Sequence, residues 1–348
     1  MRKRIIFHIG VEKTGTTSFQ RFCFDNRSII AARGILYPTR SLAFERRNAN
    51  HAPLVACYIG EGGWVDYDLS RHWRRRDDVV ASLKSEFRRA EAPTLLLSAE
   101  HFSSRFFPRH IERLAEDFRE FDCRIAIVLR AHEARIHSAY SSTIRSGRGV
   151  TLEQFVDELL LPDNWYCRYA ETIRRWRAVF GDDAVTALPF RESQNVIGAL
   201  WSDLLHFDGA PPSAKRYFAN TDFGASVLET LRRVNEAAPS PGVRSRGELF
   251  KHATRSLARS ALLRALAIAA PPREQDRAHI EGAQRAPLKA LVDEDCAWLE
   301  THAALRLPRM ADASVASAPE RPARGSLSFA TRFATWLRVW LTQIVDLF

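Results

Sequence analysis

The sequence predicts an α/β fold in which helices cover both faces of a parallel sheet of about five strands. Two observations predict it. Short apolar runs, of the length of buried strands, alternate with longer amphipathic stretches of helical period. A glycine-containing turn joins the first apolar run to the first amphipathic stretch, as in a strand–turn–helix unit. The expected strands cover residues 5–9, 35–37, 94–97, 124–129 and 185–188.

Between these strands, apolar residues recur at helical spacing, which predicts one buried face on each helix. Phe19, Phe22 and Cys23 form such a face after the first strand. After about residue 238 the strand signals stop and mostly helical patterns follow. We therefore expect a core domain over residues 1–238, a mostly helical part over 239–310 that packs on it, a linker rich in Ala, Ser and Pro over 311–326, and an amphipathic helix over 327–348.

The chain has 348 residues and a formal net charge of +10. Such a surplus suits a polyanionic partner: a nucleotide, a nucleic acid, an acidic glycan or an anionic membrane. Charge alone does not choose among them. The five cysteines are widely spaced and include no CxxC pair, so neither a zinc site nor a disulfide scaffold is expected. Reduced thiols of this kind favour a cytoplasmic protein.

Neither a leader peptide nor a membrane span is expected. The positive residues 2–4 resemble the start of a signal peptide, but the apolar run ends at residue 9, which is too short for the hydrophobic region of a signal. No run of about 18 uncharged apolar residues occurs, so no helix is expected to cross a membrane.

The first motif is Phe-His-Ile-Gly-Val-Glu-Lys-Thr-Gly-Thr-Thr-Ser, residues 7–18. A glycine turn before a helix directs backbone N–H groups and the helix dipole at a ligand, which favours a phosphate. Gly10 and Gly15 have the spacing of a nucleoside-triphosphate loop, but Thr16 replaces its lysine. The lysine stands at Lys13, so a shorter 5′-phosphate group with Lys13 against its bridging oxygen fits better. The alternative is an ordinary turn with Ser/Thr capping.

The second motif follows the fourth expected strand. Arg130 ends that strand, where a guanidinium can bind a phosphate through two parallel hydrogen bonds. Ser138 follows eight residues later, about two turns into the next helix and within reach of the same anion. An arginine that ends a strand also commonly forms a surface ion pair. The order of the two motifs along the chain favours the phosphate.

Together the two motifs resemble those of the sulfotransferases that use 3′-phosphoadenosine 5′-phosphosulfate (PAPS), especially bacterial and carbohydrate-type members. His-Ile-Gly-x-x-Lys-Thr-Gly-Thr-Thr-Ser is similar to their 5′-phosphosulfate loop, and Arg130 followed by Ser138-Ala-Tyr is similar to their 3′-phosphate segment. The resemblance covers roughly residues 5–235. It implies a P-loop-like three-layer sandwich with a helical C-terminal extension.

The resemblance also implies ligands and residue roles. PAPS would be the sulfuryl donor, adenosine 3′,5′-bisphosphate (PAP) the product, and a hydroxyl or amine, of a carbohydrate or glycolipid, the acceptor. No metal and no nucleic acid are implied. The residues implied to bind the donor are Lys13, Thr14, Gly15, Thr16, Thr17 and Ser18 at its 5′ end, and Arg130 and Ser138 at its 3′ phosphate.

Transfer to a hydroxyl requires a general base that takes the proton of the acceptor. The family often places this base near the end of the third strand, where Glu100 and His101 stand. Glu100 is the first candidate, His101 the second, and His51 in the irregular stretch 39–76 the third. The structural alternative for Glu100 is an ion pair with a nearby arginine.

Two further stretches bear on partners. The arginine cluster within residues 71–76 fits an acidic glycan and a solvated loop equally well. Residues 327–348 place aromatic and aliphatic side chains on one helical stripe, with Arg332 and Arg338 elsewhere. Such a helix fits a peripheral anchor on the anionic inner face of a membrane. It also fits a terminal helix that docks on its own core or on a second copy.

Two rival functions follow from the same residues. A P-loop nucleotide kinase would need a lysine at position 16, which is threonine here. A non-catalytic protein that binds membranes or polyanions on a degenerate sulfotransferase scaffold would be favoured by the loss of Lys13 or Arg130, and both are present.

Overall fold

The computed structural model describes residues 2–39, 49–60, 75–190, 196–212, 223–237 and 280–311. The chain divides into two compact units whose segments interleave in the sequence. Met1–Arg135, Asp163–Ala219 and Leu291–Arg309 form the first unit, and Ile136–Pro162, Asn220–Ala290 and Met310–Phe348 form the second. The expected terminal helix 327–348, nearly all of the expected linker, and Arg71 and Arg74 lie outside the described residues.

The first unit is built on a five-stranded parallel sheet, which confirms the predicted α/β fold. The strands stand in the order β2-β3-β1-β4-β5, so the first strand of the chain lies at the centre. Their bounds are β1 Arg4–His8, β2 Ile35–Leu36, β3 Thr94–Ser98, β4 Asp122–Leu129 and β5 Val185–Pro189.

Helices α1 (Thr16–Asp25), α2 (Arg27–Ala32) and α11 (Val196–Asp203) cover one face of this sheet. Their buried side chains, among them Phe22 and Trp201, pack with Leu96 and Val128 of the strands. The rings of Phe22 and Trp201 meet edge to face with centroids 5.7 Å apart. This core fixes the direction in which α1 leaves the end of β1.

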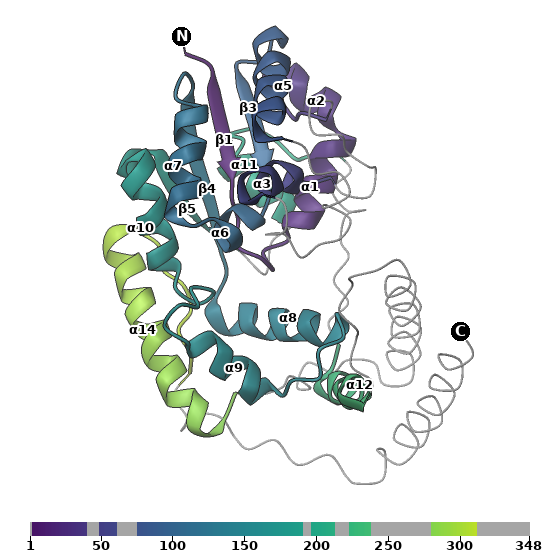
Figure 1. Ribbon diagram of the computed structural model, residues 1–348, viewed down its shortest axis with the longest axis vertical. Helices are drawn as coiled ribbons and strands as arrows, with labels where there is room; N and C mark the ends of the chain where they lie inside the picture. The colour runs from purple at the N-terminus through teal and green to yellow at the C-terminus, as the bar shows by residue number, and fades with distance from the viewer. Residues whose placement is uncertain are drawn as a thin grey trace, which may run out of the picture. The chain divides into compact units, whose positions relative to one another are not determined.

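Helices α6 (His101–Arg105), α7 (Pro108–Asp117) and α10 (Tyr169–Phe180) cover the opposite face. The Phe7 ring of β1 contacts Phe102 of α6 and Phe118 just after α7, with centroids 5.8 and 5.7 Å apart. Helix α3 (Ala52–Ile59) contacts α5 (Arg76–Arg89), α6 and α7. Figure 1 shows α7 and α10 on one side of the strands and α1 and α2 on the other. The unit therefore has three layers.

Helix α14 (Arg285–His302) begins in the second unit and ends in the first. Its Asp295 carboxylate accepts hydrogen bonds from the backbone N–H groups of Ala170 at 2.8 Å and Tyr169 at 3.2 Å. Asp295 also contacts Nε2 of the buried His132 at 3.0 Å. A carboxylate at this position satisfies the unpaired N–H groups at the start of α10 and opposes the helix dipole.

The second unit contains α9 (Leu152–Leu160), α12 (Ala225–Ala237) and the greater part of α8 (His132–Arg145). The Asn235 amide of α12 donates hydrogen bonds to the carbonyl oxygens of Ile144 at 2.7 Å and Arg148 at 3.0 Å. The last carbonyls of a helix lack the N–H donors that a further turn would supply, and Asn235 supplies donors at and just after the end of α8.

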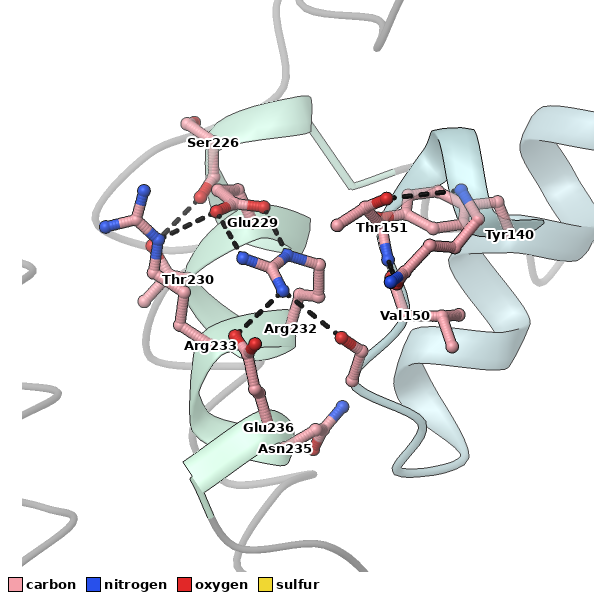
Figure 2. Close-up of polar contacts among 12 residues, drawn as sticks. Tyr140, Val150, Thr151, Ser226, Glu229, Thr230, Arg232, Arg233, Asn235 and Glu236 are labelled. Carbon is pink, nitrogen blue, oxygen red and sulfur yellow. Dashed lines mark hydrogen bonds and ion pairs between the residues drawn. The ribbon is translucent and has the colours of Figure 1, made fainter. Parts of the chain in front are cut away.

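Arg232 of α12 reinforces the same junction. Its guanidinium donates to the Gly149 carbonyl at 3.1 Å and pairs with Glu229 at 2.7 Å and Glu236 at 3.0 Å (Figure 2). A Cβ on Gly149 would lie 2.7 Å from the backbone of Glu236, so only glycine allows α12 to approach this closely.

Arg76, the last member of the arginine cluster, begins α5 and pairs with Asp77 at 2.7 Å and Asp117 at 3.6 Å. No helix in the described ranges is both long and apolar enough to cross a membrane.

Candidate functional site

The first motif lies at the carboxyl end of the central strand. Beyond β1, Ile9 N–H donates to the Ala126 carbonyl at 2.9 Å and Val11 N–H to the Val128 carbonyl at 3.2 Å. The loop between β1 and α1 therefore continues alongside β4. The helices that follow β1 cover one face of the sheet, whereas α10, which precedes β5, covers the other face. The connections that leave the neighbouring strands β1 and β4 therefore run to opposite faces. Ligands in open parallel sheets bind at such divergence points.

Two glycines allow the loop its tight path. Gly15 has a left-handed backbone with φ 73°, and a Cβ there would lie 3.0 Å from a Val196 methyl group. A Cβ on Gly10 would lie 2.9 Å from a Thr16 carbon and 3.3 Å from His8 Nε2. Lys13 is left-handed too, with φ 70°, although it carries a Cβ. A non-glycine residue in this conformation costs about 1 kcal/mol or more, so the surrounding contacts must hold it.

The start of α1 presents donors that are not used inside the protein. Gly15 is the N-cap, and no side chain caps the helix. The backbone N–H groups of Gly15, Thr16 and Thr17 donate to no atom of the described residues. The Thr14 hydroxyl is buried and donates to the Val11 carbonyl at 2.7 Å, which closes the turn. No Ser or Thr side chain therefore caps the N-terminus of α1. The N–H groups there suit an anion.

Arg130 joins the second motif to the first. It directly follows β4, and its Nη1 donates to the Lys13 carbonyl at 3.2 Å. Its guanidinium lies 5.2 Å from the Phe190 ring centroid, and its own carbonyl accepts a bond from the Tyr169 hydroxyl at 2.8 Å. Two cationic residues that are 117 positions apart in the sequence are thus brought together at the carboxyl ends of adjacent strands.

Ser138 lies on α8 in the second unit. Its assignment to the 3′ phosphate stays a prediction from the sequence.

Glu100 stands at the N-cap position of α6, two residues after the end of β3. The Gln20 amide of α1 donates to its Oε2 at 3.0 Å. Gln20 also reaches the Ser98 hydroxyl at 3.2 Å, and that hydroxyl contacts His8 Nδ1 at 2.8 Å. Burial lowers the pKa of His8 to about 4, so this imidazole is neutral at pH 7. The Glu100 carboxylate therefore belongs to a network that begins at the helix of the first motif.

His51, the third candidate base, is fully buried at the start of α3. Its Nδ1 accepts the Ser98 backbone N–H at 2.9 Å, which leaves the proton on Nε2, and Nε2 donates to the Pro38 carbonyl at 3.2 Å. Burial lowers the pKa of His51 to about 4. Both ring nitrogens are thus engaged with the backbone. His101, the second candidate, is the first residue of α6 and half-buried.

Sequence reasoning missed Gln20 and Arg135, both buried beside the motifs. A signal for each existed. Gln20 interrupts the apolar face that Phe19 and Cys23 form on α1, and Arg135 precedes the buried Ile136 near the start of α8. A polar residue at an apolar helical position is unusual enough to mark a required contact.

Among the described residues, no group of three or more His, Cys, Asp or Glu side chains could hold a metal ion. No family model, curated protein or solved structure matches the chain.

Proposed function

We propose that the chain is a sulfotransferase that moves the sulfuryl group of PAPS to a hydroxyl or amine, with a carbohydrate or glycolipid as the acceptor. The hydrogen bond from Arg130 to the Lys13 carbonyl carries the proposal. It puts a phosphate-type loop and a strand-end arginine at one point of the sheet. A donor with phosphate groups at both its 5′ and 3′ ends requires two such anion-binding elements.

In this proposal the N–H groups of Gly15, Thr16 and Thr17 bind the 5′ end of the donor, together with the hydroxyls at the start of α1. Lys13 neutralises charge on the oxygen that bridges phosphorus and sulfur. Arg130 binds the 3′ phosphate, and the sequence resemblance adds Ser138. A triphosphate-hydrolysing site is disfavoured, because position 16 holds a buried threonine in place of the required lysine.

The reaction is an in-line displacement at sulfur. The acceptor oxygen or nitrogen forms a bond to sulfur while the bond from sulfur to the bridging oxygen breaks, and PAP leaves with the bonding electron pair. Positioning and charge stabilisation supply most of the rate, by analogy with phosphoryl transfer. The acceptor loses one proton, which we assign to the Glu100 carboxylate.

Glu100 suits this role better than His51 because Gln20 orients its carboxylate, whereas both nitrogens of His51 already bind backbone groups. A general base needs an available lone pair. His101 stays the alternative base on the same helix.

The direct test is transfer of ³⁵S from labelled PAPS to a panel of polysaccharides, glycolipids and small hydroxyl or amine compounds. We expect at least one labelled product with wild type and almost none with Lys13→Ala. Removing one positioned charge of this kind typically costs about a hundredfold to a thousandfold in kcat. Alanine keeps the Cβ, so the backbone strain at position 13 is unchanged. Label transfer by Lys13→Ala at the wild-type rate would refute the role given to Lys13.

A further inference from the structure

Arg135 is a buried arginine directly beside the loop of the first motif. It lies in the first turn of α8 and is only 3% exposed. Its Nε donates to the Glu12 carbonyl at 3.2 Å, and its Nη1 donates to the Tyr166 carbonyl. The guanidinium carbon lies 3.6 Å from the Tyr166 ring centroid and 5.2 Å from that of Tyr169.

Among the described residues, no carboxylate lies within ion-pair distance of Arg135. Burial lowers the pKa of its guanidinium, but nearby groups, among them Tyr169 and the Glu12 carboxylate, raise it above its usual value, so Arg135 stays charged. Burying a cation without a directly paired anion is costly. An anion bound at the loop would offset part of that cost.

The contacts of Arg135 and Arg130 fix two successive peptide planes. Arg135 holds the Glu12 carbonyl and Arg130 holds the Lys13 carbonyl. In a planar trans peptide the carbonyl of one residue and the N–H of the next point in opposite directions. Holding these carbonyls therefore fixes the directions of the N–H groups of Lys13 and Thr14, on the side of the loop away from the two arginines.

Both arginines are supported by one residue. The Tyr169 ring faces Arg135, and its hydroxyl donates to the Arg130 carbonyl at 2.8 Å. The N–H of Tyr169 is in turn held by Asp295 at 3.2 Å. A continuous set of contacts thus leads from α14 to the loop.

We propose that Arg135 is a positioning residue of the donor site, which holds the loop in its anion-binding form and adds a buried positive charge next to it. This inference rests on the proposed function, because it concerns the 5′ end of the proposed donor. Arg135 acts through the loop and not by touching the 3′ phosphate. Its loss should therefore weaken ligands with and without a 3′ phosphate equally.

The test compares Arg135→Met, Arg135→Lys and the matched control Arg175→Met. Arg175 is a largely buried arginine whose side chain is 9% exposed. It donates to the Phe106 carbonyl at 3.2 Å, lies 4.1 Å from the Trp165 ring centroid and pairs with Glu171 at 3.9 Å. None of these contacts involves the loop. The probes are PAP and AMP, and their dissociation constants are measured by calorimetry, which separates affinity from the fraction of folded protein.

We expect Arg135→Met to bind both PAP and AMP about tenfold to a hundredfold more weakly, with their ratio unchanged. Arg135→Lys, which keeps the charge but not the planar fork, should recover part of the loss. Arg175→Met should bind like wild type. Amide hydrogen exchange over residues 9–18 should accelerate in Arg135→Met and not in Arg175→Met.

Wild-type affinity and unchanged loop exchange in Arg135→Met would overturn the inference, and so would a loss confined to PAP. If wild type binds no PAP, the proposed function fails, and the exchange of residues 9–18 alone decides whether Arg135 holds the loop. If Arg135→Met does not fold, Arg135→Lys is compared with Arg175→Met in the same way. We then expect Arg135→Lys to bind PAP and AMP more weakly than Arg175→Met does, and equal binding would overturn the inference.

Discussion

Arg130 directly follows β4 and donates a hydrogen bond to the Lys13 carbonyl in the loop of the first motif. A guanidinium can bind a phosphate through two parallel hydrogen bonds. We predict that Arg130→Ala weakens PAP binding by about 2–5 kcal/mol and AMP binding by much less, because the 3′ phosphate loses its charged partner. Calorimetry with both ligands measures the PAP-to-AMP affinity ratio.

The matched control is Arg124→Ala. Arg124 lies on the same strand, pairs with Asp122 at 3.0 Å and stands at the opposite end from the loop. It should leave both affinities unchanged. A PAP-to-AMP ratio in Arg130→Ala equal to that of wild type would show that Arg130 does not read the 3′ phosphate.

His51 gives a second prediction at this scale, on stability. Its pKa is about 4 in the folded protein and near 6.5 in the unfolded chain, because burial disfavours the charged form. Between these values the unfolded chain binds more protons than the folded protein. The free energy of unfolding should therefore fall as the pH falls from about 6.5 to about 4, by about 3 kcal/mol for this residue.

Urea denaturation of wild type and His51→Gln at pH 7 and pH 4.5 measures this contribution. The variant should be less stable at pH 7, where its hydrogen bonds are altered, and should lose less stability on acidification. His302→Gln, at an exposed position, should keep the wild-type pH dependence. Identical losses on acidification in His51→Gln and wild type would show that His51 does not titrate as described.

Residue types in a motif were predictable from the sequence, but the partners of single residues were not. Lys13 and Arg130 were found because each stands at a recognisable place next to a strand. The engagement of both His51 nitrogens depends on Ser98 and Pro38, which no local spacing connects to it. The sequence ranks Glu100 before His51 as the candidate base, but it does not show that both nitrogens of His51 contact the backbone.

At the scale of elements, hydrogen bonds from Arg232 (Figure 2) and Asn235 of α12 reach backbone carbonyls at and just after the end of α8. We predict that Asn235→Ala lowers the free energy of unfolding by about 1–3 kcal/mol, since the Ile144 and Arg148 carbonyls lose the Asn235 amide and Ile144 keeps only the Gly147 N–H. Chemical denaturation measures the change, and faster amide exchange over residues 140–150 would localise it.

Arg233→Ala is the control on the same helix. Arg233 is exposed and pairs only with Glu229 among the described residues, so its loss should cost at most about 0.5 kcal/mol. If Asn235→Ala is no less stable than Arg233→Ala, the Asn235 amide does not hold this junction.

The strands were predicted nearly to the residue. The expected run 94–97 is observed as Thr94–Ser98, and the expected run 185–188 as Val185–Pro189. A strand that is buried on both faces appears in the sequence as a continuous apolar run, which makes it visible. The order of the strands was not predictable, because it depends on pairings between segments such as β1 and β4 that lie far apart in the sequence.

At the scale of the whole molecule, the two compact units do not follow the order of the chain. Asp295 in α14 binds the backbone of Tyr169 and Ala170, which lie more than 120 positions earlier. Contacts of this kind decide which segments form a unit, and they cannot be predicted from local sequence patterns. The expected division into residues 1–238 and 239–310 was based on where strand patterns stop, which is a local property.

The net charge of +10 also belongs to this scale. It favours anionic ligands in general, so binding of any polyanion at low salt would say little about function. To test the proposed function, the binding of PAP must therefore be compared with the binding of a nucleotide of equal or greater negative charge.

The central claim is that the site accepts a nucleotide with phosphates at its 5′ and 3′ ends. The most direct measurement is the melting temperature of the wild-type protein with PAP and with ATP, at equal concentrations and physiological ionic strength. A ligand that binds the folded protein stabilises it by mass action. We predict that PAP raises the melting temperature more than ATP does, and an equal or larger rise with ATP would contradict the account.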